Sequence, residues 1–519
     1  MIIIYYYPIM KSYDDIYKTY KKEGNIVAAI ETLTIALKND DRNIQYWHEL
    51  GDMYKTQNSF QDALTCYNKI NSLQPNNGVI LNEIGICHVN LSQSDTAITF
   101  FKKVLTIKND IPDIYNNIGL CYIELKQFKR AEVTYKISYR LRPDIGIYRL
   151  LGSLYFSLKQ YEKSLFFLEK ISGPALVTSD LYNRSFSYLA QPNFEVGLAL
   201  YENRLLNNNI NHQTKEKERV EIPWIPDWNG IDAFDSILVV YEQGIGDNIQ
   251  FFRFIIELAT KFKTKTVGYF CKEVVYGLFS FEKYENINVV TNVTQSNYTH
   301  KAFIMSLPYL LQVKTILPIQ ENYITTREDL CTVWKNKLSL LKKFKVGFVF
   351  TSLLRSSIDK HIQLLEAKCL LSLDIDLICI CKKGELKDVE LEEMRTYPNF
   401  HYYDVDISVP FQDTIAILQN IDLLITVDTY IVHLAGVMGI RTWLLLGYVS
   451  EWRWSNNPTS TYWYSTVELI RIFEEKEFKH ILKTVKDKLE LLALELLTLE
   501  PNVPAHNVLL NSQLCYQLP

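Results

Sequence analysis

The sequence has little that marks a membrane protein or a nucleic-acid-binding protein. Its formal net charge is −4 over 519 residues and its basic clusters are short, so it lacks the positive footprint that nucleic acid requires. The apolar stretch at residues 1–10 is too short to cross a bilayer and has neither a positively charged n-region nor a cleavage site. The sequence therefore predicts no transmembrane segment, no nucleic-acid partner and a cytoplasmic setting.

The chain also lacks a metal-binding pattern. Its nine cysteines are scattered, odd in number and without the spacing of metal ligands, which is typical of reduced, mostly buried thiols in a cytosolic protein. Asp374 with Asp376, and Asp404 with Asp406, mimic the metal-binding DxD of one transferase class, but neither pair has other ligand candidates beside it. We interpret both pairs as surface or strand-edge residues and predict no metal and no cofactor.

A dinucleotide-binding fingerprint is incomplete. Residues 236–241 form an apolar run suited to a buried strand, and Gly244 and Gly246 break it before helical spacing resumes. The third glycine of the fingerprint is missing, and Phe251 and Phe252 follow the turn instead, so NAD binding is disfavoured. Two glycines at such a turn would instead let a substrate approach the backbone closely.

An internal repeat dominates the N-terminal part of the chain. Small residues recur there at a step of 34 or 33 residues, in two parallel series. The series are Gly51, Gly85, Gly119 and Gly152, and Ala63, Ala97, Ala131 and Ser164. With the aromatic residues that flank them, these in-phase copies resemble the tetratricopeptide repeat, in which small residues let two antiparallel helices approach closely.

Repeat arrays of this kind do no chemistry, and their concave face usually binds a peptide or another protein. Residues 25–37 suit the second helix of a degenerate first repeat, and residues 180–206 suit a capping helical pair. We therefore expect an α-solenoid with a protein-docking surface over residues 1–206. The alternative is an array that only rigidifies or dimerises the protein.

Asp247 follows the glycine turn at the mouth of the next predicted helix. Gln243, Gly244 and Gly246 form the rest of that turn. Because Asp serves well at the start of a helix, a capping role and a catalytic role for Asp247 both stay open.

Residues 420–446 carry the densest pattern in the chain. Residues 423–427 form a β-branched apolar run, Asp428 and Thr429 supply polar groups where a helix would begin, and a second apolar run follows. Strand, turn, helix and strand make one βαβ unit of a parallel sheet. Thr429 and His433 lie four residues apart, so both would face the same side of the helix start and suit a phosphate. A core position for His433 and a capping role for Asp428 are the alternatives.

Five stretches of the sequence follow one another in a characteristic order. They are EQGIGDNIQFFRF, KVGFVFTS, DTIAILQNIDLLITVDTYIVHLAG, EWRW and YWY. Together they resemble bacterial tetratricopeptide-repeat proteins that end in a heptosyltransferase-like domain of glycosyltransferase family 9. The elements Tyr201-Glu-x-Arg204 and Trp228-x-Gly230 also look like that family's junction. The resemblance implies a GT-B fold, a nucleotide-activated sugar donor, inversion at the anomeric carbon and no catalytic metal.

The resemblance also implies roles for particular residues. Asp247 would be the general base on the acceptor side. The donor-binding residues would be Ser352, Lys360 (with Arg355 as the alternative in a loop that aligns poorly), Asp428, Thr429 and His433. The tryptophans around Arg453 would form a sugar-stacking wall or pack a domain edge.

The chain departs from the family pattern at two places. Tyr430 stands where the family has a small residue, and its ring would crowd a diphosphate laid over the helix start. Phe350-Thr351-Ser352-Leu353 lacks the glycine that the family carries after this strand. Either change would alter the donor or abolish activity.

We therefore expect an α + α/β chain in which a tetratricopeptide α-solenoid precedes a GT-B fold of two Rossmann-like domains. The predicted boundaries are 1–206 for the solenoid, 207–232 for a linker and strap, 233–341 for the acceptor-side domain, 342–478 for the donor domain, and 479–519 for a C-terminal helix and tail. The predicted function is inverting, metal-independent transfer of a sugar from a nucleotide sugar to a protein or glycan presented by the repeats. The alternative is a non-catalytic interaction scaffold with a degenerate GT-B domain.

Overall fold

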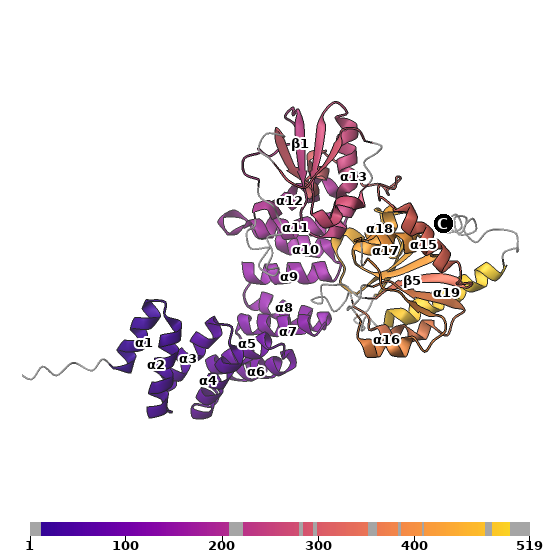
Figure 1. The fold of residues 1–519 in the computed structure, drawn as a ribbon. Helices are drawn as coiled ribbons and strands as arrows, with labels where there is room; N and C mark the ends of the chain where they lie inside the picture. Colours follow the sequence, from indigo (N-terminus) through magenta and orange to yellow (C-terminus); the bar gives the residue numbers. More distant parts are fainter. Residues whose placement is uncertain are drawn as a thin grey trace, which may run out of the picture. The chain divides into compact units, whose positions relative to one another are not determined.

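The computed structural model describes residues 12–206, 222–279, 284–293, 298–350, 361–381, 386–406, 409–472 and 480–498. Figure 1 colours the chain from indigo at its N-terminus to yellow at its C-terminus. The chain divides into two compact units. Within the described residues, the first unit comprises residues 12–154 and 166–171, and the second comprises residues 155–165 and 172–498.

Consecutive antiparallel helices build the first unit. They are α1 (Tyr13–Lys22), α2 (Ile26–Asn39), α3 (Ile44–Thr56), α4 (Phe60–Leu73), α5 (Gly78–Asn90), α6 (Ser94–Ile107), α7 (Pro112–Glu124) and α8 (Phe128–Leu141). Two more helices, α9 (Ile145–Ser157) and α10 (Tyr161–Leu168), contribute residues to both units. Each helix from α1 to α8 packs on the next one along the chain, as expected for a repeat array.

The predicted small residues lie where the two helices of a repeat meet. A Cβ atom on Gly119 would lie 2.1 Å from Cε1 of Tyr135, and one on Gly85 would lie 2.5 Å from Cε1 of Phe101. The ring of the second helix therefore occupies the space that a side chain on the first helix would need. Ala131 is fully buried in the same hairpin.

The turn inside each hairpin also repeats. Asn58, Ser92, Lys126 and Lys159 have positive φ angles between +58° and +60°, at the same step as the glycines. The left-handed backbone conformation costs free energy for any residue other than glycine. Its recurrence at these positions therefore indicates a fixed turn geometry between the two helices.

Two parallel sheets form the second unit. The first contains β1 (Ser236–Val240), β2 (Thr266–Phe270), β3 (Ile287–Val290) and β4 (His300–Phe303), in the order β3-β2-β1-β4. The second contains β5 (Phe344–Val349), β6 (Ile375–Cys379), β7 (Phe400–Tyr402), β8 (Leu423–Val427), β9 (Thr442–Leu446) and β10 (Val467–Arg471), in the order β10-β9-β8-β5-β6-β7. All the paired strands are parallel and nearly all of their residues are buried or half-buried. This region is therefore α/β and consistent with a Rossmann-like fold.

Helices connect and cover these strands. The α-helices are α11 (Thr178–Ala190), α12 (Phe194–Tyr201), α13 (Ile245–Lys261), α14 (Leu307–Leu310), α15 (Glu328–Leu338), α16 (Asp388–Met394), α17 (Gln412–Leu418), α18 (Tyr430–Val437) and α19 (Ile481–Thr498). Short 3₁₀ segments are η1 (Gly173–Ala175), η2 (Glu202–Leu206), η3 (Glu273–Leu278), η4 (Ile304–Ser306), η6 (Leu364–Leu370) and η7 (Trp452–Trp454). None of the described helices has both the length and the hydropathy of a bilayer-spanning segment.

The strand order reverses once in each sheet. In the first sheet the chain proceeds from β1 through β2 to β3 and then returns to place β4 on the other side of β1. In the second it proceeds from β5 to β7 and then places β8 on the other side of β5. Ligands of parallel sheets bind at such reversals, outside the carboxyl ends of the strands. The turns after β1 and β8, which contain Asp247 and Thr429, lie at these positions.

Candidate functional site

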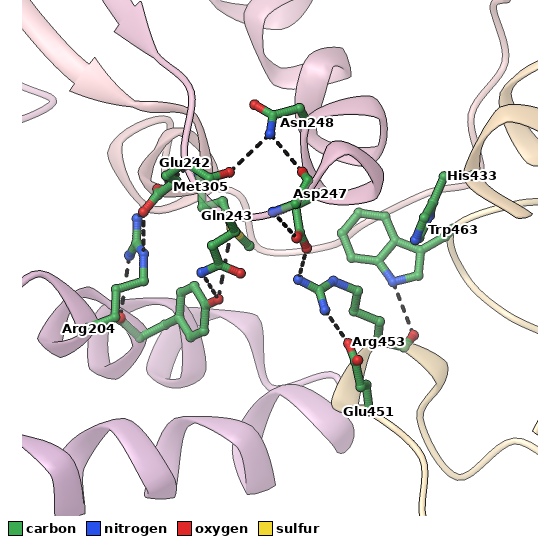
Figure 2. A network of polar contacts seen from close by, with 12 residues as sticks. Arg204, Glu242, Gln243, Asp247, Asn248, Met305, His433, Glu451, Arg453 and Trp463 are labelled. Carbon is green, nitrogen blue, oxygen red and sulfur yellow. Dashed lines mark hydrogen bonds and ion pairs between the residues drawn. The ribbon is translucent and has the colours of Figure 1, made fainter. Parts of the chain in front are cut away.

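The turn between β1 and α13 is closed by Asp247. Gly244 occupies the N-cap position of α13, and its backbone N–H donates to Oδ2 of Asp247 at 3.0 Å. The side chain of Asn248 donates to the carbonyl oxygens of Glu242 and Gly244, at 3.0 and 2.8 Å (Figure 2). Asp247 therefore does not occupy the N-cap position that the capping interpretation gave it: it is the third residue of α13, and its carboxylate reaches back to the N–H of the N-cap residue Gly244.

A buried arginine from the helical segment that precedes the first sheet binds Glu242 in the same turn. Arg204 in η2 donates to both carboxylate oxygens of Glu242, at 3.1 and 2.6 Å (Figure 2). It also donates to Oγ of Ser306 at 2.8 Å. The backbone N–H of Met305 also donates to Glu242, at 3.1 Å. Burial opposes the charge of Arg204, but Glu242 and Glu202 more than offset it and raise the pKa of Arg204. The ion pair links the end of the helical region to the carboxyl end of β1.

Asp247 also forms an ion pair with Arg453, which comes from η7 after β9. The guanidinium of Arg453 contacts Oδ1 of Asp247 and donates to Oε2 of Glu451 at 2.5 Å (Figure 2). Arg453 is only 7% exposed, and Trp463 donates to its carbonyl oxygen at 3.1 Å. Burial raises the pKa of Asp247, and the positive charge of Arg453 opposes that rise. Both oxygens of Asp247 are therefore engaged, and the charge of Arg453 favours the ionised form of the carboxylate.

At the start of α18, Thr429 rather than Asp428 is the N-cap residue. Its side chain accepts a hydrogen bond from the backbone N–H of Ile431 at 3.4 Å. Asp428 is half-buried and near enough to Arg453 to raise the pKa of that guanidinium further. The helix start therefore has a neutral cap, with a carboxylate and a guanidinium beside it.

His433 is a buried residue of α18 with fixed neighbours. It is 6% exposed, and its Nδ1 lies 2.8 Å from the hydroxyl oxygen of Tyr464. Its ring stacks on that of Trp454, with the centroids 5.6 Å apart and the planes 19° apart. These contacts give His433 the buried core position that was one of its two interpretations, although it also lies on the first turns of α18.

The N-terminal turns of α13 and α18 pack against each other. A Cβ atom on Gly246 would lie 2.9 Å from Cδ2 of His433 and 3.4 Å from Cα of Tyr430. The close approach that Gly246 permits in this structure is therefore to α18. The ring of Tyr430 packs edge-on against Phe411, with the centroids 5.4 Å apart.

Some buried polar groups at this junction have no hydrogen-bond partner among the described residues. They are Nε of Arg453, Nε1 of Trp454 and the side-chain amide of Gln250. Gln250 lies one turn after Gly246 on α13, so both point to the same face of the helix. Buried polar groups without partners are rare, and a ligand with several acceptor oxygens would satisfy the two N–H donors.

Other predicted site residues lie elsewhere. Ser352, Arg355 and Lys360 are outside the described residues. Asp376, which we expected at the surface or at a strand edge, is instead buried on β6 between β5 and β7, where it accepts a hydrogen bond from the backbone N–H of Lys343 at 3.0 Å and contacts His401. Asp406 accepts hydrogen bonds from the N–H and the hydroxyl of Thr414. Within the described ranges, no group of three His, Cys, Asp or Glu side chains could hold a metal ion.

The sequence interpretation missed the partners of the two carboxylates. Glu242 was part of a recognised stretch without a role, and Arg453 was assigned to an aromatic wall. One signal was present: Glu242 is a charged residue directly after a buried apolar strand, and such a residue needs a partner.

Comparison with known proteins identifies the N-terminal repeats. The family model described as "Tetratricopeptide repeat" matches residues 44–77, 112–145 and 145–172. The N-terminal region therefore consists of tetratricopeptide repeats, as the spacing of the small residues predicted. No curated protein matches the chain.

Several solved structures are similar to part of the chain. The MamA protein is 22% identical, with 32% of this chain and 94% of that chain covered and a TM-score of 0.29. PilW, described as a widely conserved type IV pilus biogenesis factor, is 19% identical, with 38% and 92% covered and a TM-score of 0.34. PilF of Pseudomonas aeruginosa is 17% identical, with 39% and 93% covered and a TM-score of 0.32. At TM-scores this low, these similarities carry no conclusion about the activity of this chain.

Proposed function

We propose that the chain is an inverting, metal-independent glycosyltransferase of the GT-B type, which uses a nucleotide sugar as donor and a protein or glycan as acceptor. The observation that carries the proposal is the meeting of α13 and α18, each of which follows a strand at the reversal point of a parallel sheet. A carboxylate, a buried guanidinium and unpartnered N–H donors gather there. The tetratricopeptide repeats favour a protein as the partner that supplies or carries the acceptor.

The chemistry assigns one task to each half of the Asp247–Arg453 pair. The acceptor hydroxyl oxygen would form a bond to the anomeric carbon, the bond from that carbon to the diphosphate would break, and the hydroxyl proton would pass to Asp247. Arg453 would leave Asp247 for the departing diphosphate, whose added charge suits a planar guanidinium. Donor binding would thereby free the base. The N–H groups at the start of α18 would take further phosphate oxygens.

A donor panel tests the proposal. Nucleoside diphosphate sugars of different bases and sugars would be screened for thermal stabilisation of the full-length protein, and those that bind would be assayed for release of the diphosphate. Asp247→Asn keeps the hydrogen bond to Gly244 but cannot act as a base, so we expect kcat/KM to fall at least 100-fold. Asp374→Asn, at an exposed carboxylate, is the matched control and leaves activity unchanged. Equal activity of the wild type and Asp247→Asn would exclude Asp247 as the base.

A non-catalytic interaction scaffold is the second candidate. It is favoured by the engagement of both Asp247 oxygens and by Tyr430, the bulky first residue of the helix whose start a diphosphate would use. The same panel separates the two functions. If no nucleotide sugar raises the melting temperature of the protein and none releases its diphosphate, the chain is a non-catalytic scaffold.

A further inference from the structure

A second candidate site lies within the second unit and is lined by residues that take no part in the Asp247–Arg453 ion pair. It is a pocket of about 870 Å³, which is in the range of ligand-binding cavities. Three segments line it: residues 159–163 around the start of α10, residues 190–192 between α11 and α12, and residues 455–462 after η7. Neither the transferase chemistry nor the packing of the sheets gives this pocket a role.

Four side-chain amides belong to the lining, and each is bonded to the described part of the chain at one end only. The bonded ends are Oε1 of Gln160 (from Lys163 Nζ, 2.8 Å), Nε2 of Gln191 (to Ser187 O, 3.1 Å), Nδ2 of Asn456 (to Lys159 O, 3.0 Å) and Oδ1 of Asn457 (from the N–H groups of Thr459 and Ser460, 3.1 and 2.9 Å). The other ends have no hydrogen-bond partner within the described part of the chain: two donors, Gln160 Nε2 and Asn457 Nδ2, and two acceptors, Gln191 Oε1 and Asn456 Oδ1.

Each of these four amides has a defined orientation, and one end of each makes no hydrogen bond to the described part of the chain. Because one end of each amide is bonded to the protein, the direction of the other end is fixed before a ligand arrives. Two donors and two acceptors around one pocket match the N–H and C=O groups of a polypeptide main chain, which alternate along an extended segment.

The pocket also carries unmatched positive charge. Lys159 lines it, and its ammonium has no carboxylate partner among the described residues. Arg471 lies nearby, 7% exposed, and donates only to neutral groups: the carbonyl oxygens of Trp454, Ser455 and Asn457 and the hydroxyl of Ser450. Burial and the charge of Arg471 lower the pKa of Lys159 to about 8. On the exposed rim of the pocket, the negative charge of Glu162 offsets the positive charge of Lys163.

We propose that this pocket binds an acidic segment of a polypeptide, with the four amides pairing to its main chain and Lys159 pairing to one of its carboxylates. A polypeptide is favoured over other anions because the lining offers both donors and acceptors, and because two of the three lining segments are turns between repeat-type helices, a class of structure that binds polypeptides. The proposal does not depend on the transferase activity.

The turn geometry provides a matched control for its test. Lys159 and Lys126 occupy the same left-handed position in successive hairpins, with φ of +58° in both. Lys159→Gln and Lys126→Gln therefore remove the same charge from the same backbone conformation, but only Lys159 lines the pocket.

The experiment measures fluorescence anisotropy of a labelled, capped hexapeptide that alternates glutamate and serine, titrated with the full-length protein at low salt. We expect saturable binding, loss of about tenfold in affinity with Lys159→Gln, and no change beyond twofold with Lys126→Gln. A second hexapeptide with glutamine in place of glutamate binds at least tenfold more weakly. This comparison changes only the peptide, so it stands even if a variant fails to fold.

Three results would overturn the proposal. They are no saturable binding of the glutamate peptide, equal binding of the glutamine peptide, and an equal loss of affinity with the two lysine variants, which would show general attraction to a positive surface. None of these results bears on the transferase proposal, because the donor panel uses no peptide. Conversely, an inactive protein that still binds the glutamate peptide would leave this site intact.

Discussion

In the first unit, the described ion pairs between helices are partly or largely exposed, whereas the second unit contains an arginine–carboxylate pair that is almost fully buried. Arg142 and Asp113 are 47% and 63% exposed at their side chains, while Arg204 and Glu242 are 4% and 5% exposed. Exposed pairs contribute little to stability, but a buried charge that loses its partner is costly.

The difference indicates what fixes each unit. Small residues packed under aromatic rings set the distance between helices in the repeats, so charge there is free to serve solubility and partner choice. In the sheet unit, charge fixes the turns at the carboxyl ends of strands, where an α/β fold places its ligands. The four predictions that follow test this contrast, from the largest expected effect to the smallest.

Replacing Arg204 with methionine would test the buried pair most directly. The substitution keeps much of the volume but leaves Glu242 buried without its partner, so we expect the second unit to lose about 3–5 kcal/mol. Urea unfolding followed by tryptophan fluorescence measures this, because seven of the eight tryptophans lie in the second unit. Arg142→Met, at the exposed pair, should leave the transition unchanged. Equal effects of the two variants would remove the contrast between the units.

The repeats should instead be sensitive to shape. Gly119→Ala adds a Cβ atom that would lie 2.1 Å from the ring of Tyr135, so the hairpin must shift, at a cost of about 1–3 kcal/mol. Gly78→Ala, where the nearest atom would be 3.8 Å away, should cost nothing. Thermal unfolding followed by far-ultraviolet circular dichroism compares them. If Gly119→Ala left the melting temperature unchanged, the close contact between the two helices would not be what sets the geometry of the repeat.

Peptide binding at the Lys159 pocket should depend on pH. With a pKa of about 8, Lys159 is charged below pH 8 and neutral above it, so affinity for the glutamate peptide should fall between pH 7 and 9. The other charged or titratable groups around the pocket are Tyr161, Glu162, Lys163, Tyr462 and Arg471. Burial raises the pKa of Tyr161 to about 12 and lowers that of Arg471 to about 10, so neither titrates in this window. Anisotropy at each pH checks this, and Lys159→Gln should give a flat profile; a fall in the variant as well would assign the titration to another group.

The smallest effect is expected at the start of α18. Thr429→Ala removes the N-cap hydrogen bond to Ile431 and should cost about 1 kcal/mol, while Thr429→Ser should retain it. Tryptophan-detected urea unfolding is again suitable. If serine restores stability but not donor binding, the methyl group of Thr429 has a role beyond the cap.

The elements of the fold were largely readable from local patterns. The 34-residue step predicted the helical hairpins because each repeat must bury the same contact, and apolar runs located β1 and β8 because buried parallel strands are continuously hydrophobic. The end of α15 was harder to predict: the sequence of residues 328–341 suggests one long helix, but α15 ends at Leu338. Helix ends depend on capping and tertiary contacts, which apolar spacing does not encode.

The candidate site was only partly predictable. The glycine turn, Asp247 and the start of α18 follow from strand–turn–helix patterns. The partner of Asp247 could not be predicted from such patterns, because Arg453 lies 206 residues away and the pairing depends on how α13 and α18 pack. Similarly, two adjacent capping residues left the choice between Asp428 and Thr429 open, and only the backbone angles of Thr429 decide it. For Gly246 the sequence predicted the close approach of a substrate, whereas the structure places α18 against it.

The strand order of the second sheet has a consequence for the order of folding. Each hairpin of the repeats is complete when its own residues have been synthesised, so the first unit can form as the chain leaves the ribosome. The centre of the second sheet cannot, because β5 pairs with β8, whose residues follow about 75 positions later. Contacts of such long sequence separation form slowly, so refolding should show a fast helical phase and a slower phase that reports the sheets. Until that slower step, the apolar residues of β5 lack one neighbour, and the nascent sheet is the part of the chain most prone to aggregate.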